Sequence, residues 1–350
     1  MKKRRISKQL HIGQVKIGGG APIAVQSMTK TDTRDAQATI AQIKKLEQCG
    51  CEIVRVAIPD QEAAVALAKI KKSVSIPVVA DIHFDYRLAL AALKAGTDGL
   101  RLNPGNIRDK EQIKKVVMAA KARGIPMRIG VNAGSLPPGK PRRLSTAEYM
   151  VEIAMRQVRL LEGWDYDLIK IALKAFDVPT TIEAYRGIAR KTRYPLHIGI
   201  TEAGLPQTGI IRSAAGLSIL LYEGIGDTIR VSLSAPPQEE VVTAFEILKS
   251  LNLREHGPIL VSCPSCGRSE TDIVELARMV GKYLDNITKP VKVAVMGCVV
   301  NGPGEAKDAD VGIACGKGRG ALFRKGRVIR TVNEREFFQS LTQEIENLAK

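Results

Sequence analysis

The sequence predicts an α/β protein with an N-terminal (β/α)8 barrel of the TIM type and a smaller C-terminal α+β domain. Between residues 22 and 235, a candidate strand alternates with a candidate helix eight times, and eight such units in about this length are typical of the TIM barrel. From residue 259 onward, strands, a hairpin and two helices replace this regular alternation. A doubly wound open sheet is the competing architecture for the first part, but it seldom sustains eight units.

The barrel strands are expected in short runs bounded by turn residues. They cover residues 23–28, 52–58, 77–83, 99–103, 127–132, 168–173, 196–201 and 228–233. The helices between and after them cover residues 35–48, 61–71, 86–95, 110–123, 146–162, 179–191, 209–222 and 239–251. Several helices end in a turn that contains glycine, as this alternation requires: Gly50, Gly96, Gly124 and Gly224. Residues 11–20 predict a small hairpin that closes one end of the barrel.

The domain boundary is expected at the linker Leu-Arg-Glu-His-Gly-Pro, residues 253–258. The barrel domain then occupies residues 1–253 and the second domain residues 254–350. In the second domain we expect strands at 259–262, 291–296 and 310–314, helices at 271–284 and from 334 onward, and a hairpin near 321–331. This mixture of elements is typical of an α+β domain.

Composition narrows the class of protein. The 350 residues carry a formal net charge of +17, which suits anionic small molecules and acidic protein partners. An aromatic content of 4% argues against a stacking platform for nucleic acid, and no apolar run is long enough to cross a membrane. The basic N-terminus lacks the apolar stretch of a signal peptide. Six cysteines without such a signal favour reduced thiols in the cytoplasm.

Polar residues occupy the inward-facing positions of six predicted barrel strands, where a purely structural interior would be Val, Ile and Leu. TIM-barrel active sites lie at the C-terminal ends of the strands. Four arginines and a lysine there require negative charge at the centre, and the guanidinium fork matches phosphate oxygens. The pattern predicts a diphosphate or sugar-phosphate substrate bound by Arg55, Asp81, His83, Arg101, Asn103, Arg128, Asn132, Lys170, Arg230 and Ser232, with Lys174 following Lys170 on the same strand.

The seventh strand adds a candidate for proton transfer. Its parity puts His197, Gly199 and Thr201 on one face and leaves Glu202 just past the end. A carboxylate among cations at a barrel mouth is either a proton donor or acceptor or a counter-ion for the arginines. The sequence favours the two roles equally.

The C-terminal domain contains a pattern of metal ligands. Cys263 and Cys266 are separated by two residues, Cys298 lies far downstream, and Glu305 follows seven residues later. Three thiolates and a weaker carboxylate suit an iron–sulfur cluster with one exchangeable iron. A zinc knuckle with Cys315 as the fourth ligand is the alternative, and spacing alone leaves both open.

Seven longer strings carry a resemblance to a known family. They are VQSMT at 25–29, ADIHF at 80–84, LRLNPGN at 100–106, RIGVNAGSL at 128–136, GITEAG at 199–204, CPSCGR at 263–268 and MGCVVNGPGE at 296–305. Through these strings nearly the whole chain resembles the 4-hydroxy-3-methylbut-2-enyl diphosphate synthases, reductive iron–sulfur enzymes of the non-mevalonate isoprenoid pathway. No extra middle domain is present, so the chain resembles the bacterial short form.

The resemblance implies a reaction and a cofactor. The reaction opens the ring of 2-C-methyl-D-erythritol 2,4-cyclodiphosphate with two electrons, and a hydroxyl is lost. The cofactor is a [4Fe-4S] cluster on Cys263, Cys266, Cys298 and Glu305, in a domain similar to those of sulfite and nitrite reductases. Cys315 is then not a ligand.

The resemblance also implies roles and partners. The arginines and their neighbours hold the diphosphate, and Glu202 handles protons. Flavodoxin or ferredoxin supplies the electrons, and the basic run between residues 317 and 330 is a candidate surface for such an acidic carrier. The active unit is a head-to-tail homodimer.

Two other functions compete with this interpretation. One is a phosphosugar aldolase with a Schiff base on Lys170 or Lys174 and a zinc-bound tail. The other is a non-enzymatic RNA-binding protein, which rests on charge alone and gives no reason for cations to gather at strand ends.

Overall fold

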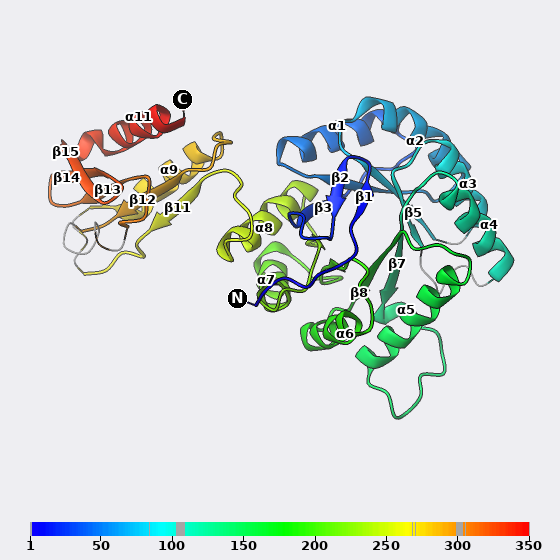
Figure 1. The fold of residues 1–350 in the computed structure, drawn as a ribbon. Coiled ribbons are helices and arrows are strands. Elements are labelled where there is room, and N and C mark those ends of the chain that lie inside the picture. Colours follow the sequence, from blue (N-terminus) through cyan, green and yellow to red (C-terminus); the bar gives the residue numbers. More distant parts are fainter. Residues whose placement is uncertain are drawn as a thin grey trace. The chain divides into compact units, whose positions relative to one another are not determined.

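The computed structural model describes residues 2–83, 85–102, 109–267, 269, 271–298, 304 and 306–349. The chain separates into two compact units, residues 1–254 and 255–350 (Figure 1). None of the helices in these described ranges is both long and apolar enough to span a membrane.

The first unit is a closed barrel of parallel strands, which confirms the fold class expected from the sequence. The strands pair in the order β8-β7-β6-β5-β4-β3-β10-β9, and a parallel bridge between Ile171 and Leu196 joins β8 to β9. Their bounds are β3 (Ala24–Met28), β4 (Ile53–Ala57), β5 (Val78–Ile82), β6 (Gly99–Leu102), β7 (Met127–Asn132), β8 (Ile169–Lys174), β9 (His197–Ile198) and β10 (Thr228–Ile229).

The helices of this unit surround the strands (Figure 1). They are α1 (Ala36–Gln48), α2 (Gln61–Ser73), α3 (Tyr86–Lys94), α4 (Lys110–Lys121), α5 (Thr146–Glu162), α6 (Val178–Lys191), α7 (Pro206–Tyr222) and α8 (Pro237–Ser250), with a short 3-10 turn η1 (Ala133–Ser135). Most start behind a side chain that accepts a first-turn N–H, which satisfies an otherwise unpaired donor: Asp35, Asp60, Asp85, Asp109, Ser145 and Asp177.

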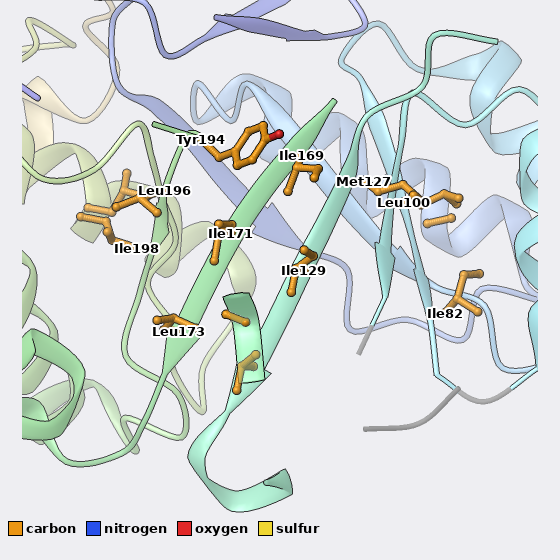
Figure 2. Close-up of a cluster of buried hydrophobic side chains, with 14 of the residues drawn as sticks. Ile82, Leu100, Met127, Ile129, Ile169, Ile171, Leu173, Tyr194, Leu196 and Ile198 are labelled. Carbon is orange, nitrogen blue, oxygen red and sulfur yellow. The ribbon is translucent and has the colours of Figure 1, made fainter. Parts of the chain in front are cut away.

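The main core lies between the strands and the helices. On β8, Ile169, Ile171 and Leu173 belong to one buried apolar cluster with Val151 of α5 and Ile188 of α6. Figure 2 shows these strand residues beside those of β7. Because successive side chains of a strand point to opposite faces, the alternate residues of β8 face the barrel interior.

A hairpin precedes the barrel, as expected from residues 11–20. It consists of β1 (Leu10–Ile12) and β2 (Val15–Ile17), paired antiparallel. Its apolar side chains pack with Ala24, Ile53 and Val79, which lie at the N-terminal ends of β3, β4 and β5. The hairpin therefore covers the barrel end opposite to the strand C-termini.

The second unit is a five-stranded sheet in the order β11-β12-β13-β14-β15. The first three strands are parallel and the last two antiparallel. Helix residues such as Val280 and Leu341 share a buried cluster with Val293 and Ile313 of the sheet, so both helices cover one face. The elements are β11 (Ile259–Ser262), α9 (Ile273–Leu284), β12 (Lys292–Met296), β13 (Val311–Cys315), β14 (Arg319–Arg324), β15 (Arg327–Asn333), η2 (Glu334–Glu336) and α11 (Phe337–Ala349).

Two barrel strands are much shorter than the sequence predicts. The expected strands at 196–201 and 228–233 are reduced to the two-residue β9 and β10. Beyond β10 the backbone finds other partners, because Leu233 N–H donates to Glu240 Oε1 at 3.1 Å and Ser234 N–H donates to the Gly204 carbonyl at 2.9 Å. The chain therefore leaves the sheet where the mouth of the barrel begins.

Candidate active site

A cavity of about 220 Å³ opens at the C-terminal ends of the barrel strands. Four arginines, one lysine and one carboxylate line it in the described part of the chain. The lining residues are Met28, Arg55, Asp81, His83, Arg101, Arg128, Gly130, Asn132, Ala172, Lys174, Thr201 and Arg230. The cavity is therefore strongly cationic.

Asp81 at the end of β5 is the buried counter-ion of this cavity. Its Oδ1 accepts from Arg101 Nη1 at 3.0 Å, and its Oδ2 lies 3.4 Å from Arg55 Nε and 3.7 Å from His83 Nε2. Burial raises the pKa of the carboxyl, but the nearby cations, Arg55 foremost, outweigh it and lower the pKa to about 2. Asp81 is therefore charged and holds two of the arginines in place.

Three guanidinium groups of the cavity have N–H groups without a described partner. Arg128 is 4% exposed, yet its Nε and Nη1 hydrogen-bond to no other described residue. Nε of Arg101 and Nε of Arg230 likewise hydrogen-bond to no other described residue. Burial and the neighbouring guanidinium groups lower the pKa of Arg128 below its ordinary value. Because an unpaired buried donor is costly, these N–H groups are suited to bind an anion.

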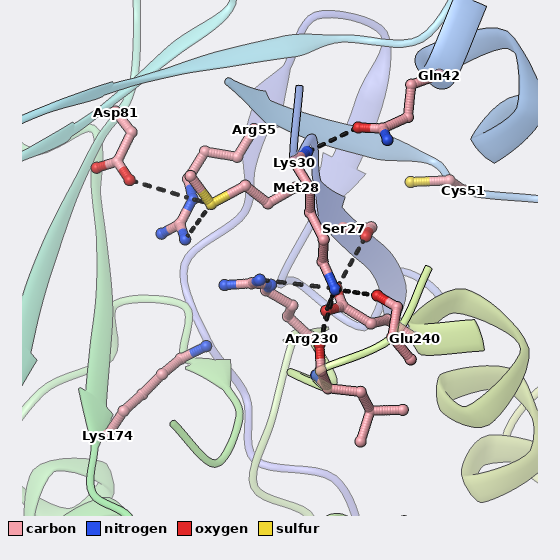
Figure 3. A network of polar contacts seen from close by, with 12 residues as sticks. Ser27, Met28, Lys30, Gln42, Cys51, Arg55, Asp81, Lys174, Arg230 and Glu240 are labelled. Carbon is pink, nitrogen blue, oxygen red and sulfur yellow. Dashed lines mark hydrogen bonds and ion pairs between the residues drawn. The ribbon is translucent and has the colours of Figure 1, made fainter. Parts of the chain in front are cut away.

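One side of the cavity rests on a second buried carboxylate. Glu240 of α8 accepts from Ser27 Oγ at 3.1 Å and lies 3.1 Å from Lys30 Nζ and 3.6 Å from Arg230 Nη2. Arg55, besides its contact with Asp81, donates to Met28 Sδ from Nε at 3.2 Å and from Nη2 at 2.8 Å. Figure 3 shows Arg230, Arg55 and Lys174 converging on one space from different walls.

Two glycines make room for these long side chains. A Cβ at Gly130 would lie 3.0 Å from Arg101 Nε, and one at Gly199 would lie 2.5 Å from Lys174 Nζ. A side chain at Gly199 would also lie 2.6 Å from the Arg230 carbonyl, which rules it out, and one at Gly130 would force Arg101 to shift. The glycines in RIGVNAGSL and GITEAG therefore permit the cations to reach the cavity.

The structure brings together seven of the barrel residues selected from the sequence: Arg55, Asp81, His83, Arg101, Arg128, Asn132 and Arg230. Asn103 lies outside the described residues. Lys170, Ser232 and Glu202 are not among the described lining residues.

Lys170 lies deeper in the barrel than expected. It pairs in register with Arg128, which pairs with Arg101. Because the strands of a closed barrel are staggered, residues paired from β6 through β7 to β8 lie progressively nearer to the N-terminal end of the barrel. Lys170 accordingly borders a separate small cavity with Gln26 and Met127, and the cavity lysine of β8 is Lys174.

Glu202 lies beyond β9 and is exposed. Its backbone is left-handed, with φ at 55°, which is uncommon for a residue other than glycine. Such conformations persist only where the surrounding structure fixes them, and they gather at functional sites.

Sequence reasoning missed several contributors to the site. Met28 and Glu240 support the arginines from β3 and α8, and Thr201 lines the cavity. The parity rule puts Thr201 on one face with His197 and Gly199 but assigns it no role. No local signal marks Met28 or Glu240, because their partners are distant in sequence.

In the second unit, the cysteines follow the ends of two adjacent parallel strands. Cys263 comes directly after β11, and its N–H donates to the Val295 carbonyl at 3.2 Å. Cys298 follows β12, and Gly297 N–H donates to Cys263 Sγ at 3.1 Å. Cys266 is exposed. This end of the sheet gathers thiol donors and a backbone N–H directed at sulfur, which fits a thiolate-bound cluster.

Cys315 differs from these three residues. It is fully buried in the apolar core beside α9 and α11, and burial raises the pKa of its thiol to about 12. A thiol must lose its proton to bind a metal, so Cys315 is a poor ligand. Among the described residues, no group of three or more His, Cys, Asp or Glu side chains is placed to hold a metal ion, and Glu305 lies outside them.

Fold and cavity place the chain among the TIM-barrel enzymes with a cationic site at the mouth. Its first unit matches the GcpE TIM-barrel domain over residues 7–245, and its second matches the GcpE protein C-terminal domain over residues 259–347. The chain belongs to the GcpE family.

Relatives match over the full length. The 4-hydroxy-3-methylbut-2-en-1-yl diphosphate synthase (flavodoxin) of Dehalococcoides mccartyi (strain CBDB1) is 65% identical over 345 residues, 99% of each chain. Proteins of the same name from Geobacter sulfurreducens and Thermodesulfovibrio yellowstonii are 56% and 55% identical, covering 98% and 99% of each chain.

The solved structure of Yersinia pestis dihydropteroate synthase is similar in fold only. It superimposes with a TM-score of 0.52 at 11% identity and covers 70% of this chain and 99% of that one. This similarity concerns the barrel.

Proposed function

We propose that the chain reduces 2-C-methyl-D-erythritol 2,4-cyclodiphosphate to 4-hydroxy-3-methylbut-2-enyl diphosphate. Two electrons enter, the ring opens at a carbon–oxygen bond, and a hydroxyl leaves as water. The full-length relatives carry the name of this activity. The observation in the structure that supports it best is the cavity with five cations and unpaired Arg128 donors. The aldolase interpretation is not favoured, since no relative named here carries it.

The substrate diphosphate is held by the cations of the cavity. Arg101, Arg128 and Arg230 each offer at least one guanidinium N–H without a described partner, and such forks bind phosphate oxygens bidentately. Lys174 adds a point charge from β8. Asn132 at the end of β7 also lines the cavity, and we assign it to the substrate hydroxyls. Asp81 fixes the arginines and does not need to touch the substrate.

Glu202 is the proposed proton donor. It follows β9 on the side of the barrel where the strands end, so in this proposal it faces the part of the substrate that loses the hydroxyl. A carboxylic acid there protonates the leaving oxygen. Its left-handed backbone is a conformation that gathers at functional sites.

The cofactor we propose is a [4Fe-4S] cluster on Cys263, Cys266, Cys298 and Glu305. When bound, such a cluster supplies the two electrons one at a time and a Lewis-acidic iron for the hydroxyl. The chain's contribution is to hold the thiolates at the ends of β11 and β12. The name of the relatives includes flavodoxin, and we propose reduced flavodoxin as the electron donor, in the cytoplasm.

The active unit we propose is a homodimer with sites shared between chains. Arg254 ends the barrel unit, where it donates to the Ile23 carbonyl at 2.7 Å and pairs with Glu52 at 3.0 Å. These residues lie at the N-terminal ends of β3 and β4, opposite to the cavity. The nine residues from Arg254 to Cys263 reach at most about 30 Å. This span is short for a path around the helices to the cavity of the same chain, so a partner's cavity is the simpler destination.

Anaerobic turnover tests the function. The purified chain should contain iron and acid-labile sulfide and convert the cyclodiphosphate with reduced flavodoxin, with product identified by mass spectrometry. C263S, C266S and C298S should lose both iron and activity, because each removes a thiolate. C315S is the matched control and should retain both. Colourless wild-type protein with one zinc, or loss of iron only in C315S, would contradict the proposal.

A further inference from the structure

Behind the cavity, a buried histidine contacts the cavity lysine. Nε2 of His197 lies 3.3 Å from Lys174 Nζ. His197 is fully buried on β9, and Lys174 ends β8. The proposed function uses Lys174 to bind the substrate but assigns nothing to His197.

The other ring nitrogen of His197 also has a partner. Nδ1 lies 2.8 Å from Thr228 Oγ1, and the two residues face each other in the register of β9 with β10. Strand pairing therefore fixes the ring, and Lys174, His197 and Thr228 form a chain of polar contacts leading away from the cavity wall.

The chemistry of these groups decides which atom donates. Burial, then Arg128, lowers the pKa of Lys174 well below its ordinary value, whereas a bound diphosphate favours the charged form. With the diphosphate bound, Lys174 is an ammonium with three donors and no acceptor, so it donates and Nε2 accepts. The proton of the neutral ring then lies on Nδ1 and points to Thr228 Oγ1. Burial, then the positive charge of Lys174, lowers the pKa of His197 well below its ordinary value, which keeps the ring neutral.

The space around Lys174 is restricted as well. A Cβ at Gly199 would lie 2.5 Å from its Nζ, 3.0 Å from its Cε and 2.6 Å from the Arg230 carbonyl. The lysine therefore crosses the face of β9 through a gap that only glycine leaves. His197 and Gly199, two residues apart on the same face, set where the ammonium ends.

We propose that His197 is a positioning residue, a neutral acceptor held in the Nδ1–H form by Thr228, which fixes the Lys174 ammonium for the substrate diphosphate. This inference rests on the proposed function. An imidazole suits this role because its two nitrogens point in different directions. Nδ1 can be held by Thr228 of β10 while Nε2 faces the ammonium of Lys174.

Two substitutions of His197 separate the two contacts. In H197Q the amide oxygen can occupy the position of Nε2 and accept from Lys174, whereas in H197N the amide occupies the position of Nδ1 and cannot reach Lys174. We expect H197N to weaken pyrophosphate binding to the full-length reconstituted protein roughly tenfold or more, the effect of losing a hydrogen bond to a charged group. H197Q should restore most of the affinity. H11N, at an exposed histidine of β1, is the control.

A double-mutant cycle excludes a purely structural role. In a K174M background the additional effect of H197N should vanish, since the positioned group is gone. If H197N weakens pyrophosphate binding by the same factor in the wild-type and K174M backgrounds, the inference is wrong. If K174M itself leaves pyrophosphate binding unchanged, the proposed function of the cavity fails instead.

A spectroscopic measurement covers the case in which H197N does not fold. The chain has four histidines, so their ring nitrogens can be assigned by ¹⁵N NMR. We expect one buried Nδ1–H ring that stays neutral well below the ordinary histidine pKa of 6.5. T228V should shift that signal and weaken pyrophosphate binding. A signal in the Nε2–H form would overturn the inference.

Discussion

The carboxylate of Asp81 is the residue around which the cavity is arranged. It is 2% exposed and contacts two arginines and a histidine. A buried carboxylate with these partners stabilises the fold only while it is charged. The cations it holds would repel one another without it.

Removing this charge should destabilise the protein in a way that depends on pH. The folded pKa of Asp81 is about 2, below its ordinary value of 3.8, so its contribution is present above pH 4 and is lost as the pH falls through 2. Two pKa units correspond to about 2–3 kcal/mol. We expect D81N to lower the free energy of unfolding by this amount at pH 7, and the difference from wild type to shrink below pH 4. Urea titrations at several pH values measure it. Equal stability at pH 7 would contradict the prediction.

Lys170 is a second residue whose charge can be tested. It is 3% exposed, and its Nζ hydrogen-bonds to no other described residue. Burial, then Arg128, lowers its pKa below the ordinary 10.5. Between this lowered pKa and the ordinary value, the unfolded chain binds a proton that the native protein releases, so the stability due to this group rises with pH up to about 10.5.

K170M should accordingly be more stable than wild type at neutral pH, by on the order of 1–3 kcal/mol. The gain should shrink as the pH approaches 10, which thermal unfolding across pH 7–10 can follow. Pyrophosphate affinity should stay near that of wild type, whereas K174M should lose it. A loss of affinity in K170M as large as in K174M would place Lys170 in the substrate site.

At the scale of elements, the strands position the cations and the glycines on them leave the space. Gly130 lies on β7 between Arg128 and Asn132, and Arg101 of β6 lies across it. In G130A the new methyl group would press on Arg101 Nε, and the guanidinium would have to move.

We therefore expect G130A to raise the KM for the cyclodiphosphate roughly tenfold, the effect of one misplaced charged hydrogen bond, with the iron content unchanged. G134A is the matched control, because a Cβ there meets no atom within 4 Å. Steady-state kinetics compare the two. An unchanged KM in G130A would show that Arg101 does not hold the substrate where the cavity suggests.

At the scale of the whole molecule, the proposed reaction requires that the cavity of a barrel unit and the cysteines of a second unit come together. The barrel unit holds the cationic cavity, and the second unit holds the thiols. Helix α7 exposes Ile211, Ile219 and Tyr222, which are eight and three residues apart and so share one side of the helix, and exposed apolar residues gathered in this way are suited to a protein interface. This surface supports the proposed homodimer.

Complementation tests whether the sites are shared. A chain without the cluster (C298S) is combined by co-expression with a chain without the proton donor (E202A). Their heterodimer should recover about half the activity per dimer if each cluster serves the partner's barrel, since one site then has both intact parts. Each parent homodimer should be inactive. Inactive heterodimers, verified by native mass spectrometry, would show that the cluster serves its own barrel.

The sequence by itself determined the order and type of the elements, the fold class and most of the cavity residues. These depend on local rules: alternating side chains on a strand put Arg55, Arg101, Arg128 and Arg230 on the inner face, and glycine-containing turns mark helix ends. The family strings added the reaction, which local patterns alone left open between several enzymes.

Only the tertiary structure decided the height of each residue in the barrel and the partner of each charge. Parity treats Lys170 and Lys174 alike, but the stagger of a closed barrel puts one below the cavity and the other in its wall. Glu240 and His197 became part of the site through contacts between strands and helices far apart in the chain. A one-dimensional pattern records which face a side chain takes, whereas closure of the barrel fixes which side chains share a level.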